Sequence, residues 1–262
     1  MSPPPSLLRA PIVEAVLDLD CDLPADYRLA EPQEEAKQPH AVIDRVARAL
    51  AERYPKLRLR TSRGVTISEL IRSEPKVPAH RALEAVQFVQ ADERQLVQWR
   101  SGGFSFNRLA PYEGLDQYLG EIERTWHLFV ETAAPRFVRS VRLRTINRIR
   151  VPLINGEPDL VGSFADAPEL PAGGRLRRLD FFQQQHAIDP VFGIGVELVL
   201  ASQASEAHAV PVIFDSIVAS PALELDPVDW ASILEWIQRL RRLKNELFTQ
   251  TLSPACLERL RS

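Results

Sequence analysis

The most constraining feature of this sequence is residues 137–151, where arginine and apolar side chains alternate over a long stretch. Side chains point to opposite faces of a β-strand in turn, so this alternation predicts a half-buried strand. One face would carry Arg142, Arg144, Ile146, Arg148 and Arg150, and the other Val141, Leu143, Thr145, Asn147, Ile149 and Val151. A strand with one charged and one apolar face is typical of an antiparallel sheet that is covered on one side only.

Alternating or apolar runs bounded by Gly and Pro predict further strands. We expect them at residues 12–20, 57–60, 65–70, 83–89, 95–99, 104–109, 176–187, 192–201 and 209–219. Apolar residues three and four positions apart predict helices at residues 40–53, 115–134 and 226–247. Asp226 is the expected N-cap of the third helix, with Pro227 at its first position. Ser253 and Pro254 can start a short final helix.

The order of these elements repeats. A strand, an insert, a three-stranded meander and a long helix occur in residues 11–135 and again in residues 136–262. The sequence therefore predicts an α+β fold, with an antiparallel sheet, two long amphipathic helices on one face and a possible pseudo-twofold duplication. We expect a single compact unit over residues 1–262, with those two ranges as possible halves, because the chain is long enough to bury a substantial core.

The bulk composition excludes several classes of protein. The formal net charge of -3 disfavours a non-specific nucleic-acid binder, which usually has a basic balance. Cys21 and Cys256 have no metal-ligand spacing and form no disulfide framework. Neither a secretory signal nor an apolar run long enough to cross a bilayer is present, since Glu197 interrupts the longest run. We expect a cytoplasmic protein that does not bind membranes.

No local catalytic motif can be read from the spacing of residues. There is no Gly-x-Ser-x-Gly elbow, phosphate-binding loop or EF-hand loop, and the histidines are scattered. Gly193 and Gly195 form part of a dinucleotide-binding pattern, but a strand follows them where that pattern requires a helix. The sequence therefore predicts no catalytic residue, no metal site and no cofactor.

The arginine face of residues 137–151 allows two interpretations. Four guanidinium groups on one face repel each other unless anions neutralise them, and guanidinium is a natural partner of carboxylate and phosphate. The face can bind an anionic ligand, with Arg142, Arg144 and Arg148 as contacts. Alternatively, its charges pair with acidic neighbours such as Asp180 or Glu197, which the 35 acidic residues of the chain favour.

Two further residues belong to this candidate ligand site. Glu14 lies in the first strand among apolar neighbours, so it can act as an acid or base if it faces a cleft. Asn147 lies on the apolar face, where a buried amide needs hydrogen-bond partners. A hydrogen bond between Asn147 and Asn245 would pin the last long helix to the sheet.

Four segments carry a resemblance to a known family. They are residues 11–16 (PIVEAV), 103–109 (GFSFNRL), 143–149 (LRTINRI) and 243–248 (LKNELF), in this order. Together they resemble a sporadically distributed family of uncharacterised prokaryotic proteins of about this length. The family commonly has an aromatic residue where this chain has Thr145, and a small residue where it has Arg142. The resemblance implies no activity. The patchy distribution of the family implies mobile or defence-associated genes.

These observations leave three hypotheses. The favoured one is a non-enzymatic protein that binds a ligand or a protein through the arginine face, so its partner is a protein or an anionic small molecule. The second is an enzyme for an anionic or nucleotide-like substrate, with Glu14 as acid or base and Arg144 as the anion contact. The third is a nucleic-acid binder, which the net charge disfavours. The sequence does not indicate an oligomeric state.

Overall fold

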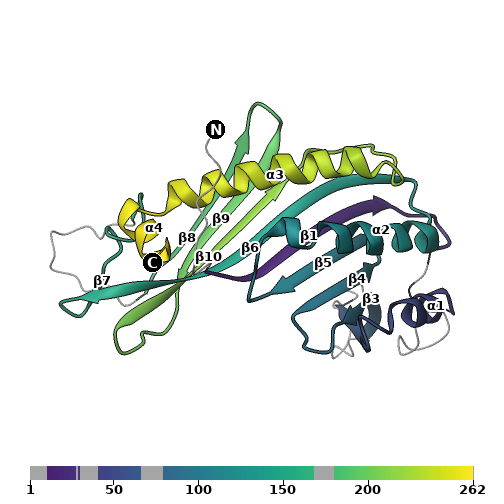
Figure 1. Cartoon of the computed structure of the whole chain (residues 1–262), viewed down its shortest axis with the longest axis horizontal. Helices are drawn as coiled ribbons and strands as arrows, with labels where there is room; N and C mark the ends of the chain where they lie inside the picture. The colour runs from purple at the N-terminus through teal and green to yellow at the C-terminus, as the bar shows by residue number, and fades with distance from the viewer. Residues whose placement is uncertain (1–10, 28, 30–40, 66–78, 168–179, 262) are drawn as a thin grey trace, which may run out of the picture.

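The computed structural model describes residues 11–27, 29, 41–65, 79–167 and 180–261. In these residues ten strands form one antiparallel sheet in the order β2-β3-β4-β5-β1-β6-β10-β9-β8, and β7 pairs with β6 outside this path. The predicted α+β class with an antiparallel sheet is confirmed. Figure 1 shows the sheet as a long twisted layer with β1 and β6 near its middle.

The strands follow the predicted alternation closely. Their bounds are β1 (Ile12–Asp22), β2 (Lys56–Val65), β3 (Ala79–Val89), β4 (Gln95–Arg100), β5 (Gly103–Leu109), β6 (Phe137–Ile154), β7 (Glu157–Pro158), β8 (Phe182–Asp189), β9 (Ile194–Ser202) and β10 (Ala209–Ala219). The predicted break between the strands at 57–60 and 65–70 is wrong, because β2 continues to Val65 through a register shift between Arg60 and Thr61. Residues 66–70 and 176–179 lie outside the described residues.

The helices are α1 (Ala41–Leu50), the short 3-10 helix η2 (Leu115–Gln117), α2 (Leu119–Ala133), α3 (Trp230–Thr251) and α4 (Pro254–Arg261). The predicted N-cap Asp226 is wrong: α3 is capped by Asp229, whose side chain accepts a hydrogen bond from the Ser232 backbone N–H. A tertiary contact explains the shift, since the Pro227 carbonyl accepts a 3.0 Å hydrogen bond from Trp126 Nε1 and holds this segment outside the helix.

One face of the sheet, which we call the helix face, holds the core. Leu17 of β1, Phe104 of β5 and Leu143 of β6 point to this face, where the described helices cover them. Trp126 and Phe129 of α2 pack on Phe104, with ring centroids 5.7 and 5.8 Å away. Burying each such aromatic side chain stabilises the fold by about 2 kcal/mol.

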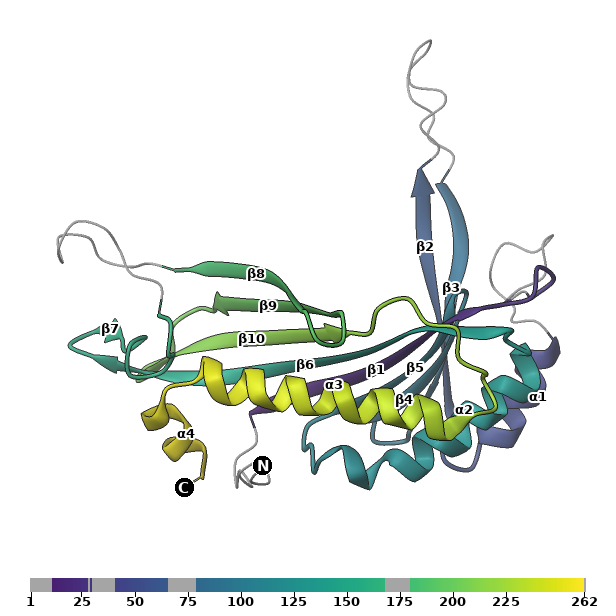
Figure 2. The ribbon, with the colours of Figure 1, turned by 90° about the horizontal axis from the view of Figure 1, so that it is seen from above.

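The helix α3 covers the centre of the sheet. Its fully buried residues Ile233, Ile237 and Leu240 belong to the same core cluster as Val141 and Leu143 of β6. Figure 2 shows α3 running along β6 and β1, with α2 on the same side of the sheet. The opposite face, which we call the open face, carries the arginines of β6 and is not covered by any described helix.

No described helix is long and apolar enough to cross a membrane.

Candidate functional site

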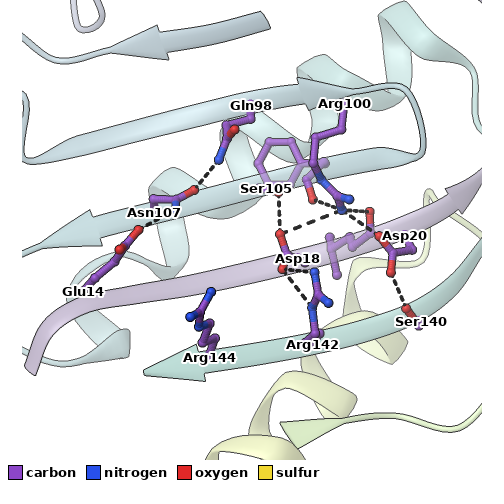
Figure 3. Close-up of polar contacts among 12 residues, drawn as sticks. Glu14, Asp18, Asp20, Gln98, Arg100, Ser105, Asn107, Ser140, Arg142 and Arg144 are labelled. Atoms are coloured by element: carbon purple, nitrogen blue, oxygen red, sulfur yellow. Dashed lines mark hydrogen bonds and ion pairs between the residues drawn. The ribbon is translucent and has the colours of Figure 1, made fainter. Parts of the chain in front are cut away.

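The structure pairs Arg142 with a carboxylate of its own sheet. Arg142 donates from Nε and Nη2 to Asp18 Oδ2, at 3.0 and 2.7 Å. Asp18 is only 7 % exposed, and it also accepts a hydrogen bond from the Ser105 hydroxyl. Figure 3 shows Asp18 between Ser105, Arg142 and Arg100, and Arg100 also binds Asp20 at 2.7 Å. The charge of Arg142 is therefore neutralised within the sheet.

The other arginines of this strand are paired as well. Arg144 donates hydrogen bonds to both carboxylate oxygens of Asp215 on β10, and the shortest of these is 2.5 Å. The hydrogen bond to Asp215 raises the pKa of Arg144. Arg148 and Arg150 share Glu206, at 2.6 and 3.0 Å. Each of the four guanidinium groups thus has a carboxylate partner, as the second interpretation of this face expects.

The partners differ from the two acidic residues suggested by the sequence. Asp180 forms no recorded ion pair with these arginines within the described residues, and Glu197 accepts a 2.8 Å hydrogen bond from Gln184. Strand register decides the partners, because Asp18 lies opposite Arg142 across the β1–β6 pair. Asp215 lies opposite Ile146 on β10, one step along the open face from Arg144.

Glu14 and Asn147 lie on opposite faces of the sheet. Glu14 is on the open face, where its Oε1 accepts a 2.9 Å hydrogen bond from Asn107, as Figure 3 shows. Asn147 is on the helix face and is 1 % exposed; its Nδ2 donates to the Phe214 carbonyl oxygen at 3.2 Å. No hydrogen bond joins Asn147 to Asn245 among the described side chains. The structure therefore groups Glu14 with Arg142, Arg144 and Arg148, and separates Asn147 from them.

A cavity of about 350 Å³ lies on the other side of the sheet, between the helix face and α3. Ligand sites commonly have volumes of roughly 300–1,000 Å³ and mostly apolar walls. Strands β1, β5 and β6 form one side of this cavity, and residues 112–118 with α3 form the other. Leu17, Phe106, Leu115 and Leu143 supply apolar wall, while the polar groups come from Arg108, Tyr112, Glu113, Arg241 and Lys244. We refer to it as the helix–sheet cavity.

Arg108 enters the helix–sheet cavity from β5. It follows Phe104 and Phe106 on the helix face, so a charged side chain continues a row of apolar ones. Its guanidinium carbon lies 5.2 Å from the centroid of the Tyr118 ring, a cation–π contact. Its Nε is buried and has no hydrogen-bond partner within the described chain. Arg108 therefore keeps an unused donor at the cavity wall.

Arg241 and Lys244 enter the cavity from α3. Arg241 binds both carboxylate oxygens of Asp116, at 2.6 and 2.7 Å, which ties α3 to η2. Lys244 has no recorded hydrogen bond or ion pair with any described residue. Burial, and secondly repulsion from Arg241, lower the pKa of Lys244 to about 8. The cavity thus holds two cationic side chains, Arg108 and Lys244, that no carboxylate of the described chain neutralises.

This arrangement suits a small molecule with a negatively charged head and an apolar body. Arg108 and Lys244 can bind the anion, and the leucine and aromatic wall can cover the rest. A metal ion has no comparable ligand set, because no group of three His, Cys, Asp or Glu side chains is found among the described residues.

The sequence carries a signal for this site in the position of its two cations. Lys244 continues the buried stripe of α3, in which Ile233, Ile237 and Leu240 precede it at spacings of three and four. Arg108 occupies the core-facing position of its strand. A cation in a core stripe and a cation on an apolar strand face both indicate a buried charge that requires a partner.

The four segments that carry the family resemblance meet at the helix–sheet cavity, although they lie far apart in the sequence. Each contributes to the wall: Ile12 and Ala15 from the first, Phe106 and Arg108 from the second, Leu143 and Thr145 from the third, Lys244 and Asn245 from the fourth. Arg144 also lines it, whereas Glu14, Arg142, Arg148 and Asn147 do not.

Comparisons of the chain with models of protein families, with curated proteins and with solved structures find no match.

Proposed function

We propose that this is a non-enzymatic binding protein for a small anionic molecule, and that the ligand lies in the helix–sheet cavity with Arg108 and Lys244 as its cationic contacts. The observation that carries the proposal is the unpaired state of both partly buried cations, within the described chain, in a partly open cavity with mostly apolar walls. A buried charge without a partner costs stability, so such groups gather where a ligand supplies the missing charge.

The proposed site differs from the arginine face that the sequence favoured. The guanidinium groups of Arg142, Arg144 and Arg148 already bind Asp18, Asp215 and Glu206, so an incoming anion has to displace an internal carboxylate. In the helix–sheet cavity, the anion meets Arg108 and Lys244, which have no carboxylate partner in the described chain. Binding in the cavity therefore requires no rearrangement of existing ion pairs.

The resemblance supports the same location. If four separated segments are shared among related chains, a common ligand site explains why all four meet at one cavity. The strand order also supports, as a proposal, the duplicated unit, since β1-β5-β4-β3 on one side of the sheet centre mirrors β6-β10-β9-β8 on the other. The cavity then lies beside the seam between the two units.

Titrations of the full chain with benzoate and phenyl phosphate test the proposal, because each probe joins an anionic head to an apolar ring. Arg108→Met should weaken binding by roughly 10- to 100-fold, the value of one charge-assisted hydrogen bond. The matched control is Arg148→Met, which removes a paired arginine of the open face and should leave the affinity unchanged. Isothermal titration calorimetry gives the dissociation constants.

Two results would overturn the proposal. One is a wild-type protein that binds neither probe at millimolar concentrations. The other is the reverse pattern, in which Arg148→Met loses binding and Arg108→Met keeps it. Thermal unfolding of both variants verifies that each is folded before it is titrated.

The enzyme hypothesis has less support. Glu14 and Arg144 share the open face, and the charge of Glu14 contributes to the raised pKa of Arg144. However, Glu14 is bound to Asn107 and does not line the helix–sheet cavity. The nucleic-acid hypothesis needs unpaired guanidinium groups on the open face, and those of β6 are paired.

A further inference from the structure

Lys244 differs from the other lysine whose side chain the structure describes. Lys56 lies at the surface and binds Glu93 at 2.8 Å. Lys244 lies against the helix–sheet cavity, and its electrostatic neighbour among the described residues is Arg241, a group of the same charge. Lys244 thus lines the cavity without a carboxylate of the described chain to hold its side chain in the ammonium form.

An anion site alone does not explain why a lysine occupies this position. Arginine keeps its charge under all physiological conditions and binds carboxylates through two donors, so it is the better permanent anion contact. A lysine that is desolvated and placed beside another cation is a weaker anion contact but a stronger nucleophile, because its neutral amine is populated. The pair of Arg108 with Lys244 thus combines an anion contact with a nucleophile.

We propose that Lys244 captures a small 2-oxo acid as a Schiff base, with the carboxylate of that acid held by Arg108 and its carbonyl carbon bonded to Lys244 Nζ. The proposal rests on the proposed function, since it uses the same cavity and the same anion contact. It adds the chemical class of the ligand and the covalent bond.

The step is balanced without an oxidant or a reductant. The ammonium of Lys244 first loses a proton; Nζ then adds to the carbonyl carbon, and the carbonyl oxygen takes up a proton to give a carbinolamine. The hydroxyl group leaves as water after a second proton transfer, and a protonated imine remains. In sum, an ammonium and a ketone give an iminium ion and one water molecule.

Tyr112 lines the same cavity, and burial raises the pKa of its phenol above the ordinary value. The phenol therefore stays neutral and can donate a hydrogen bond to the departing hydroxyl group, while solvent supplies the proton. The apolar wall formed by Leu17, Phe106 and Leu143 limits access of water, which slows hydrolysis of the imine.

Reductive trapping tests the inference on the full chain. The protein is incubated with pyruvate and sodium cyanoborohydride, and the reduced adduct is located by peptide mass spectrometry. At pH 8 about half of the Lys244 side chains are neutral, against roughly one in three hundred for a lysine with an ordinary pKa. Labelling of Lys244 should therefore be at least about tenfold faster than labelling of Lys56.

Variants separate the covalent step from anion binding. Lys244→Arg should abolish the adduct at this position and keep binding of benzoate, because the charge is retained. Arg108→Met should slow labelling of Lys244 by roughly tenfold at low pyruvate concentration, through weaker binding of the carboxylate. Lys56→Arg, the control, should leave labelling of Lys244 unchanged.

The outcomes distinguish the two proposals. Benzoate binding that requires Arg108, together with labelling of Lys244 no faster than that of Lys56, overturns the Schiff base and leaves the anion site standing. A wild-type protein that does not bind benzoate overturns the anion site. Labelling of Lys244 that is unaffected by Arg108→Met overturns the role of Arg108 as the carboxylate contact.

Discussion

The two faces of the sheet treat positive charge in opposite ways. On the open face, each arginine of β6 is bound to a carboxylate of a neighbouring element. In the helix–sheet cavity, by contrast, two of the cationic lining residues, Arg108 and Lys244, lack such a partner in the described chain. The comparison teaches that the number of arginines on a strand is a poor indicator of a ligand site. The pairing state of each cation is the better one.

Removal of the most buried carboxylate of the open face should have the largest effect. Asp18→Ala leaves the Arg142 guanidinium without its acceptor and the Ser105 hydroxyl without its partner, and should lower the free energy of unfolding by about 3 kcal/mol. Urea denaturation measures the change. The matched control is Glu224→Ala, which removes an exposed partner of Arg139 and should cause no resolvable change. Equal losses in the two variants would show that the burial of Asp18 does not decide how much an ion pair stabilises the fold.

Removal of the unpaired cation should have an effect of similar size and opposite sign. Lys244→Met should raise the free energy of unfolding at pH 7 by up to about 3 kcal/mol, because the pKa of Lys244 is lowered from 10.5 to about 8 in the folded state. Between these two values the unfolded chain binds more protons, so the wild-type protein gains stability as the pH rises. The difference between the two proteins should therefore shrink from pH 8 to pH 10.5.

Urea denaturation over this pH range measures that difference. Lys244→Arg serves as the control, since a guanidinium does not titrate there and its stability relative to Lys244→Met should stay constant. A gap between the wild-type protein and Lys244→Met that is independent of pH would contradict the partly buried, unpaired state of Lys244.

Exposed pairs of the open face should have the smallest effect. Glu206→Gln removes the shared partner of Arg148 and Arg150, and we expect a slight decrease of the urea midpoint at low salt that disappears in 1 M salt, where the Debye length is about 3 Å. The loss in Asp18→Ala should persist at the same salt concentration. A large, salt-independent loss in Glu206→Gln would remove the distinction between the exposed and buried pairs of this face.

The strands could be predicted from the sequence because their pattern is local. The alternation over residues 137–151 fixes which side chains share a face, and β6 (Phe137–Ile154) follows it. The helix stripes likewise place α2 and α3 within a few residues. Where the prediction is wrong, a contact between distant segments decides, as when the hydrogen bond from Trp126 to Pro227 moves the cap of α3 to Asp229.

The candidate site could not be predicted in the same way. The partner of Arg142 is Asp18, 124 residues away, and only the register of the β1–β6 pair brings the two together. Lys244 and Arg108 are separated in the same manner, and their shared cavity depends on how α3 lies on the sheet. The sequence pattern indicates that each of them is a charged residue at a core position. It does not indicate that the two residues line one cavity.

The central position of β6 also has a consequence for biosynthesis. The seam of the sheet joins β1 to β6, whereas β5 and β4 form a local hairpin and β10 pairs with β6 at a separation of 71 residues. A growing chain emerges from the ribosome with β1 and β5 well before β6, so the edge of β1 that will meet β6 stays unpaired during that interval. An unpaired strand edge is a template for association with other chains. Asp18 and Asp20 place two carboxylates on β1. Repulsion between these carboxylates in two neighbouring chains opposes such pairing until β6 is synthesised and its Arg142 neutralises Asp18.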